Sequence, residues 1–266
     1  MVKRLNRFTV AAAFLAVQLP AFSADSETEY TEQTLPYWME QLTSSNSKTM
    51  LQRVQATVAV TKIGKPAVPR LIDALRSEDA DIREVCVQVL GKIGNDAHSA
   101  AQALLGIVNS DRSPDVRASA INAVVDITGG SLEIAELLIS CLNDNSPSVI
   151  NAAIVALGKS SKYAEKAVRP LTKRISKAGL GTDPETLLIL NTLRCIGRAA
   201  KESLPEVEAL LRHKNSTIRL SAVSAVIGIS ETFSDAERLL TPLLADSDPN
   251  VRNSVAQSLS ELKKAP

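Results

Sequence analysis

The feature that most constrains this 266-residue chain is that it repeats itself. A short polar turn, an aliphatic residue, usually an arginine, and then an apolar-periodic stretch recur, for example in SEDADIREVCVQVLGKIG from Ser77 and SDRSPDVRASAINAVVDIT from Ser110. Aligned on the arginine, the anchor positions of the successive copies are Arg53, Arg83, Arg117, Ile150, Thr186, Arg219 and Arg252, at intervals of 30 to 36 residues. Such self-similarity predicts a row of stacked units rather than one compact core.

The stretch after each anchor has the periodicity of an amphipathic helix, because places three, seven and ten after the anchor share one helix face. Three places on lie Ala56, Cys86, Ala120, Ala153, Ile189, Ala222 and Val255. Seven places on lie Val60, Leu90, Val124, Leu157, Leu193, Val226 and Leu259, and ten places on lie Ile63, Ile93, Ile127, Ser160, Ile196, Ile229 and Leu262. A column of mostly small residues beside two bulky ones allows neighbouring helices to pack closely.

A second apolar pattern precedes each polar turn, as in Val68, Leu71, Ile72 and Leu75. We expect it to form the first helix of each unit, so that every unit is a helical hairpin that buries its faces only by stacking on its neighbours. With eight aromatic residues in a chain that is 45% hydrophobic, the core is built from Ala, Leu, Val and Ile. The predicted fold is all-α, a solenoid of about seven stacked helical hairpins.

These units resemble HEAT repeats, of the short type found in phycobilisome lyases. The resemblance rests on the unit length, on the Ile-Gly and Pro-x-Leu pattern of IGKPAVPRLIDAL and on the SPDVRASA turn, and it covers roughly residues 34–264. It implies that the second helix of each hairpin lines the concave side of a superhelix. It also implies an inter-repeat ladder in which a turn Asp bonds a helix Arg. The residues expected in that ladder are Arg83, Asp111, Arg117, Arg219, Asp246 and Arg252.

The ladder matches fully at Asp111 with Arg117 and at Asp246 with Arg252, but less well between them. Asp144 stands opposite Ile150, and His213 takes the place of the Asp before Arg219. The fifth unit lacks the Arg, and its turn is stretched by Gly179 and Gly181. We therefore expect the ladder to be broken in the middle and the superhelix to bend at repeat five.

The N-terminal residues have the layout of a secretory signal peptide: basic residues from Lys3, an apolar run over 8–19 and small residues before a cleavage point that we place after Ser23. About 12 apolar residues are too few to span a bilayer comfortably, so an uncleaved anchor is the weaker interpretation. We predict a signal peptide over 1–23, a flexible acidic segment over 24–33 and a repeat domain over 34–266. The predicted location is outside the cytoplasm, periplasmic or secreted, in a bacterium rather than a eukaryote.

The sequence offers little chemistry. It contains no P-loop, GxGxxG, GxSxG or HExxH motif. His98 and His213 lie in polar turns, where we expect them to be solvated, and Cys86, Cys141 and Cys195 have no metal-site spacing and are expected to be buried helix residues. Without the signal peptide the charge is slightly negative, which argues against nucleic acid as a partner. We predict no catalytic residue, cofactor, metal or stable membrane insertion.

The candidate partner-binding residues lie five and nine places after the anchors, on the open face of the second helices. They are Gln88, Asn122, Asn191, Ser224 and Gln257 in one column and Lys62, Lys92 and Lys159 in the next, where Asp126 makes the charge mixed. Repeats stack about 10 Å apart, so the amides form an interrupted row that suits extended peptide backbone. The alternative is a solvated helix face, since any such helix has a polar outer stripe.

Two hypotheses about function follow. The favoured one is a non-catalytic exported scaffold that binds another protein or peptide through the concave face. The other is a HEAT-type module associated with an enzyme, a lyase or hydroxylase subunit. Iron-dependent HEAT-like hydroxylases carry paired His-Glu dipeptides, and this sequence has none. A purified sample with bound metal or pigment would favour the second hypothesis.

Overall fold

The computed structural model describes residues 34–44, 50–160, 163–177 and 184–264. In these residues the chain forms fourteen α-helices and no strand. The helices are α1 (Leu35–Thr43), α2 (Met50–Ile63), α3 (Val68–Ala74), α4 (Ala80–Ile93), α5 (Ala101–Ser110), α6 (Pro114–Thr128), α7 (Leu132–Cys141), α8 (Pro147–Lys159), α9 (Val168–Lys177), α10 (Pro184–Ile196), α11 (Leu204–Leu210), α12 (Ser216–Ile229), α13 (Phe233–Leu240) and α14 (Pro249–Lys264). The predicted signal peptide, the acidic segment and Gly179 and Gly181 lie outside the described residues.

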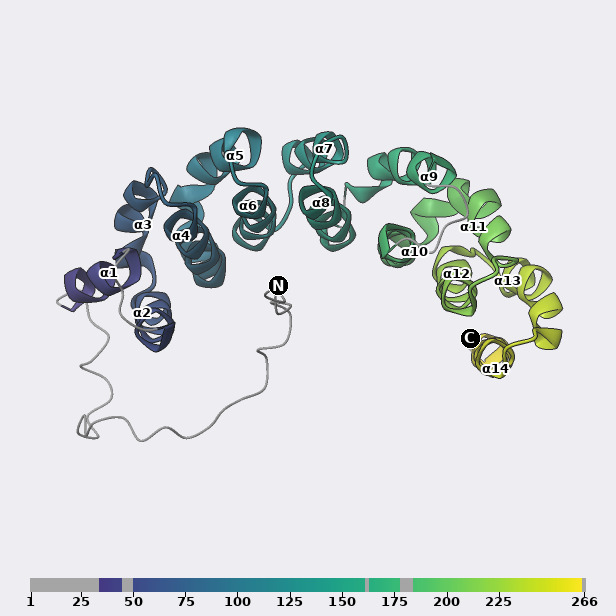
Figure 1. Ribbon diagram of the computed structural model, residues 1–266. Coiled ribbons are helices and arrows are strands. Elements are labelled where there is room, and N and C mark those ends of the chain that lie inside the picture. Colours follow the sequence, from purple (N-terminus) through teal and green to yellow (C-terminus); the bar gives the residue numbers. More distant parts are fainter. Residues whose placement is uncertain (1–33, 45–49, 161–162, 178–183, 265–266) are drawn as a thin grey trace, which may run out of the picture.

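The helices form an arch of two layers (Figure 1). The odd-numbered helices form the outer layer, and the even-numbered helices form the inner layer that lines the concave side. Each repeat is one outer and one inner helix, and the seven repeats of the described chain follow one another along the arch. The predicted α-solenoid of stacked hairpins is confirmed.

The core runs along the middle of the arch, between the two layers. All seven residues of the column three places after the anchors are buried, from Ala56 to Val255. In the column seven places after, Leu259 is half-buried and the others are buried. Small side chains at the first column bring the inner helices close together, and the bulky second column fills the space against the outer helices. The column ten places after is less deeply buried: its buried residues are Ile127, Ser160 and Ile229, and its half-buried ones are Ile63, Ile93, Ile196 and Leu262. The predicted core face is therefore correct at the first two columns and only partly buried at the third.

Glycines and prolines set the ends of several helices. Gly64, Gly94 and Gly197 follow α2, α4 and α10 with φ of 70°, 67° and 72°, a conformation that other residues rarely adopt. Pro69 and Pro205 stand at the start of α3 and α11, where a missing N–H does not break a helical hydrogen bond. Short 3-10 turns, η1 (Lys65–Ala67), η2 (Gly94–Ala100), η3 (Ala164–Ala167), η4 (Gly197–Ser203) and η5 (Thr241–Ala245), precede the next outer helix or, for η5, follow α13.

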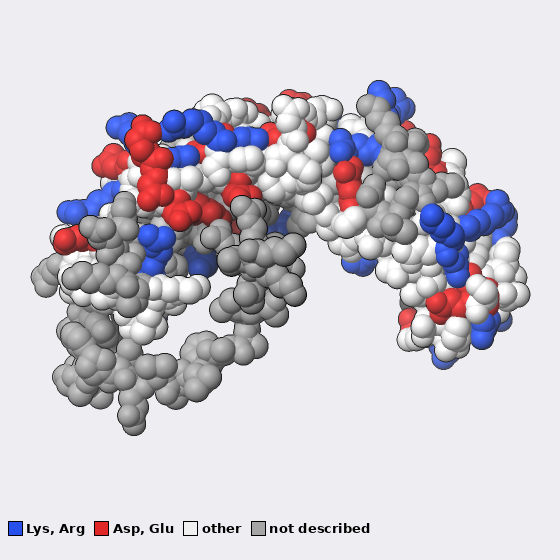
Figure 2. Space-filling view, in the orientation of Figure 1, with Lys and Arg blue, Asp and Glu red and all other residues white. Residues whose placement is uncertain are grey.

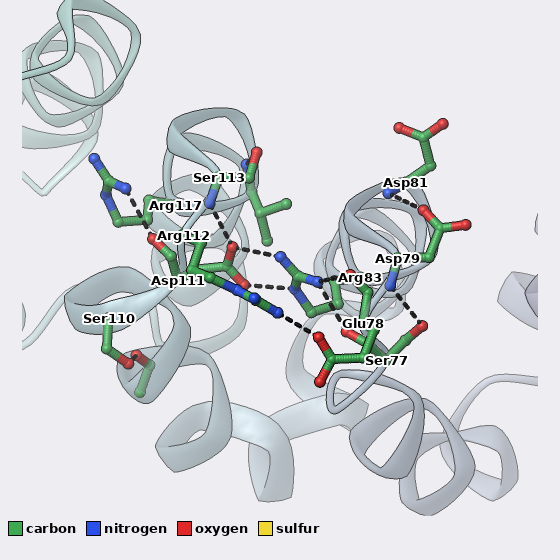
Figure 3. Close-up of polar contacts among 12 residues, drawn as sticks. Ser77, Glu78, Asp79, Asp81, Arg83, Ser110, Asp111, Arg112, Ser113 and Arg117 are labelled. Atoms are coloured by element: carbon green, nitrogen blue, oxygen red, sulfur yellow. Dashed lines mark hydrogen bonds and ion pairs between the residues drawn. The ribbon is translucent and has the colours of Figure 1, made fainter.

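An arginine ladder ties neighbouring repeats together at three interfaces, at the turns between outer and inner helices; Figure 3 shows the one between repeats two and three. Arg83 donates from Nε and Nη2 to the two carboxylate oxygens of Asp111, at 2.7 and 2.8 Å, and from Nη1 to the carbonyl oxygen of Ser77 in its own turn. Asp111 also accepts the backbone N–H of Ser113, which shapes the turn before α6. One guanidinium thus closes its own turn and fixes the turn of the next repeat.

The same contacts recur at two further interfaces. Arg117 forms the fork with Asp144, with Nη2–Oδ1 at 2.8 Å, and Arg219 forms it with Asp246, with Nη2–Oδ1 at 2.6 Å. Hydrogen bonding to Arg219 lowers the pKa of the Asp246 carboxyl. Burial alone would raise the pKa of the Asp111 carboxyl, but hydrogen bonds from Arg83 and from the Ser113 N–H bring it below the usual value. The carboxylates are therefore held in their charged form.

The ladder runs between repeats, as the resemblance implied, but the Asp and Arg that were matched within one repeat are not its partners. Asp111 pairs with Arg83 of the preceding repeat and not with Arg117, and Asp246 pairs with Arg219 and not with Arg252. Arg252 bonds only the carbonyl oxygens of its own turn, because no repeat follows it in the described chain. The reason is geometric. Nη1 of each paired guanidinium donates to a carbonyl oxygen of its own turn, and Nε and Nη2 point towards the Asp of the following repeat.

The ladder is broken in the middle, as expected, but not at Asp144, which Arg117 engages. Repeats four and five have Ile150 and Thr186 at the place of the arginine, and neither side chain can form the fork. The Thr186 hydroxyl is buried without a hydrogen-bond partner among the described residues. Arg174 of α9 links repeats four and five instead, donating to the Leu142 carbonyl oxygen at 2.6 Å and to Glu185 at 2.5 Å. Whether the arch bends at repeat five stays a prediction.

Candidate functional site

The candidate partner-binding residues lie together on the inner layer of the arch. Gln88, Asn191, Ser224 and Gln257 are exposed on α4, α10, α12 and α14, and Asn122 is half-exposed on α6. Each lies five places after its anchor, so the columns of the sequence become a row along the concave side (Figure 1). Val58 and the 39% exposed Val155 interrupt the row of polar side chains.

The side chains of this row bond within their own helices. Gln88 donates to Glu84 at 3.0 Å, Gln257 donates to Glu261 at 2.8 Å, and Asn191 accepts from Arg194 at 2.9 Å. Asn122 and Ser224 donate to the carbonyl oxygens four residues earlier. These bonds orient the side chains, but every amide keeps a second donor hydrogen or a carbonyl lone pair for a ligand.

The neighbouring column carries mixed charge, as the sequence indicated. Lys62, Lys92 and Lys159 are exposed, and Lys159 lies 3.6 Å from Asp126 of the preceding repeat. Both side chains of that pair are about half exposed, so the pair adds little stability. The concave side therefore offers separate cations and not a continuous basic stripe.

An apolar stripe on α2 was missed by the sequence analysis. Met50, Leu51, Val54 and Val58 are 78%, 50%, 50% and 46% exposed, and their spacing places them on one helix face. Val54 and Val58 occupy the same concave positions as Glu84 and Gln88 in the next repeat. A comparison of every place in the alignment, rather than of the polar columns alone, would have found it. We call these four residues the α2 stripe.

Two predicted environments were wrong. Cys195 is exposed on α10, because the place nine after the anchor faces solvent on the concave side. Cys86 and Cys141 are buried as expected. His213 is only 3% exposed, because it fills the ladder position of an Asp and its Nδ1 accepts the backbone N–H of Asn215 at 3.1 Å. His98 is exposed as predicted.

In the residues that the structure describes, no three His, Cys, Asp or Glu side chains gather as metal ligands would. No described helix combines the length and the apolar character that crossing a membrane requires. Burial raises the pKa of the Cys86 thiol to about 12, which leaves it an inert core residue.

Comparison with known proteins agrees with this architecture. A sequence model described as HEAT repeats matches residues 35–125, and a model of the adaptin N-terminal region matches residues 97–266, which is more than half of the chain. This chain is a HEAT-repeat protein that belongs, over residues 97–266, to the adaptin N-terminal region family. No curated protein is a detectable sequence relative of the chain.

Solved structures share the fold of this HEAT-repeat chain. An engineered protein superposes with a TM-score of 0.54 at 21% identity, over 74% of this chain and 96% of its own. A designed armadillo repeat protein gives 0.52 at 20% identity, over 73% and 99% of the two chains. The complex of CpcE and CpcF of phycocyanin lyase from Nostoc sp. PCC7120 gives 0.53 at 24% identity, over 72% and 75%. At these identities the likeness is one of fold.

Proposed function

We propose that this HEAT-repeat chain is a non-catalytic, exported scaffold that binds another protein through the concave face of its arch. The observation that carries the proposal is the inner layer of the arch, in which five of the seven described inner helices carry a polar side chain at the same place. Repeat solenoids use such extended concave surfaces for binding. The partner we expect is an extended protein segment, whose backbone suits the amide row.

The α2 stripe adds a second reason. A large exposed apolar patch on a soluble chain is commonly a surface that binds another protein. Here four large apolar side chains remain exposed on the inner helix of the first repeat. A partner that places apolar side chains on the α2 stripe and runs on along the amide row would bury this surface.

The binding proposal is tested by comparing two sets of variants in capture from an extract of the host. The inner set is Gln88→Ala, Asn122→Ala and Asn191→Ala, and the outer set is Arg70→Ala, Gln102→Ala and Glu136→Ala. We expect the inner set to lower the capture of proteins retained by the wild type, and the outer set to leave it within about twofold. Ala is accepted on helix surfaces, so both sets should fold. Loss with the outer set alone would place the working surface on the convex side.

The export proposal rests on the residues over 1–23 and needs its own experiment. Expression with the full N-terminus in a bacterial host, followed by fractionation and intact-mass measurement, shows where the chain is processed. We expect a periplasmic product that begins at Ala24. A full-length cytoplasmic product would contradict export without affecting the concave-face proposal.

A further inference from the structure

A hollow lined by basic residues lies on the edge of the arch that carries the turns between outer and inner helices, away from the concave face. It has a volume of about 520 Å³ and lies between repeats six and seven, where α11, the turn before α12 and α13 meet. Arg212, Lys214 and Arg238 line it and are exposed, with the Arg219–Asp246 pair at its base. Lys and Arg side chains gather over this end of the arch in the space-filling view (Figure 2). We call this hollow the 6–7 furrow.

The charge of the 6–7 furrow is not neutralised from within. Arg219 and Asp246 satisfy each other through the ladder. In the described residues, Arg212, Lys214 and Arg238 have no ion-pair partner within 4.0 Å. The one other carboxylate in the lining is the half-buried Glu208. Three exposed cations therefore face one hollow with a single carboxylate to offset them.

The equivalent hollow between repeats two and three, the 2–3 furrow of about 430 Å³, shows that the fold does not require this charge. It has Arg76 where the 6–7 furrow has Arg212, seven places before the anchor. At the place of Lys214 it has Glu78, which pairs with Arg112 across the furrow (Figure 3). At the place of Arg238, fourteen before the next anchor, it has Ala103.

The two furrows share the ladder pair, and their charges differ through mostly exposed side chains. The 6–7 furrow has Lys214 in place of Glu78, Arg238 in place of Ala103 and Ser247 in place of Arg112. Like charges gathered without a partner repel one another and do not stabilise the folded chain. Their arrangement is instead suited to an anion that enters the furrow, because a guanidinium and a carboxylate form paired, directional hydrogen bonds.

We propose that the 6–7 furrow binds the carboxylate side chains of an acidic segment of a partner protein. The cations are confined to one furrow, whereas nucleic acids are held by many phosphate contacts along a basic track. The chain as a whole has a formal net charge of only +1. The exposed Pro242 beside Arg238 gives the furrow an apolar edge, which suits a peptide that carries aliphatic as well as acidic side chains.

The test uses fluorescein-labelled hexaglutamate and the same peptide built from glutamine, measured by fluorescence anisotropy at about 50 mM salt, where electrostatic contacts are weakly screened. We expect hexaglutamate to bind and hexaglutamine not to bind. Lys214→Glu combined with Arg238→Ala gives these two places the residues of the 2–3 furrow and should weaken binding about tenfold, because two charged contacts are lost.

A matched control separates the furrow from general charge. Lys65→Glu combined with Arg70→Ala makes the same change in net charge on exposed residues of repeat two, and binding should stay within about twofold of the wild type. An equal loss with this control, or no preference for hexaglutamate, would overturn the proposal. Tighter binding of tripolyphosphate through the same two residues would overturn it in favour of a phosphate ligand. Should the double variant fold poorly by circular dichroism, Arg238→Ala alone provides the same comparison.

Discussion

At the scale of single residues, the ladder arginines explain how a degenerate repeat keeps its register. Arg83 reaches Asp111, which is 28 residues further on, and Arg117 and Arg219 reach carboxylates 27 residues further on. The sequence could predict which residues take part, because the Asp and Arg places recur. It could not predict the pairing, since an Asp lies near an Arg both within a repeat and across the interface. Only the packed geometry decides between the two.

The ladder predicts a ranking of three arginine variants. Arg117→Ala should lower the free energy of unfolding by on the order of 1–2 kcal/mol, because it removes a charged hydrogen-bond pair and leaves Asp144 without it. Arg83→Ala should lower it more, since that pair is more buried, with side chains 7% and 4% exposed. Arg252→Ala should lower it least, because Arg252 bonds only carbonyl oxygens. Urea unfolding measures all three, and equal effects would contradict an inter-repeat ladder.

The ladder also predicts a dependence on pH. The pKa of Asp111 lies below its usual value in the folded chain, so its stabilising contribution is present above the unfolded pKa of about 3.9 and is lost as the pH falls through the folded value. Asp111→Asn should therefore destabilise the chain clearly at pH 6 and much less at pH 2.5. A difference in unfolding midpoint that stays constant between the two pH values would show that Asp111 stabilises by packing and not by charge.

The three cysteines should separate into two classes. We expect a thiol reagent to label Cys195 rapidly in the native chain and all three cysteines after denaturation. Cys86 and Cys141 are buried, and burial raises the pKa of both thiols, so little reactive thiolate is present. Native labelling counted by mass spectrometry checks this. Two or three labels before unfolding would show that the core opens readily.

At the scale of helices, most of the structure could be predicted from the sequence. The columns at three and seven places after the anchors identified the buried faces. The environment of His213 could not be judged from local polarity, because its place in the repeat, rather than the character of its neighbours, buries it. The α2 stripe was missed because only the polar columns of the open face were compared, and not every place in the alignment.

Helix packing predicts opposite effects for two Gly→Ala variants. Ala is a better helix former than Gly by up to about 1 kcal/mol, and a Cβ at Gly106 of α5 would meet nothing within 4 Å, so Gly106→Ala should stabilise the chain. A Cβ at Gly228 of α12 would lie 2.9 Å from the carbonyl oxygen of Arg194 on α10. Gly228→Ala should therefore destabilise by on the order of 1 kcal/mol. Thermal unfolding measures both, and a stabilising Gly228→Ala would show that the inner helices are less closely packed than described.

At the scale of the whole molecule, the arch presents two surfaces with different properties. The concave side combines the α2 stripe with a row of amides, and the turn side carries the basic 6–7 furrow. The sequence predicted the concave columns, because they repeat. It could not predict the furrow, whose cations come from different elements, Arg212 and Lys214 from one repeat and Arg238 from the next, and meet only when the repeats stack.

The most direct test of the concave-face account uses Cys195, the exposed cysteine of the inner layer. A photo-cross-linker attached to Cys195 should cross-link the captured partner in high yield. The same group attached to the outer helix α5, through Gln102→Cys in a Cys195→Ser background, should cross-link it poorly. A partner that cross-links from position 102 and not from position 195 would contradict the claim that the concave face is the binding surface.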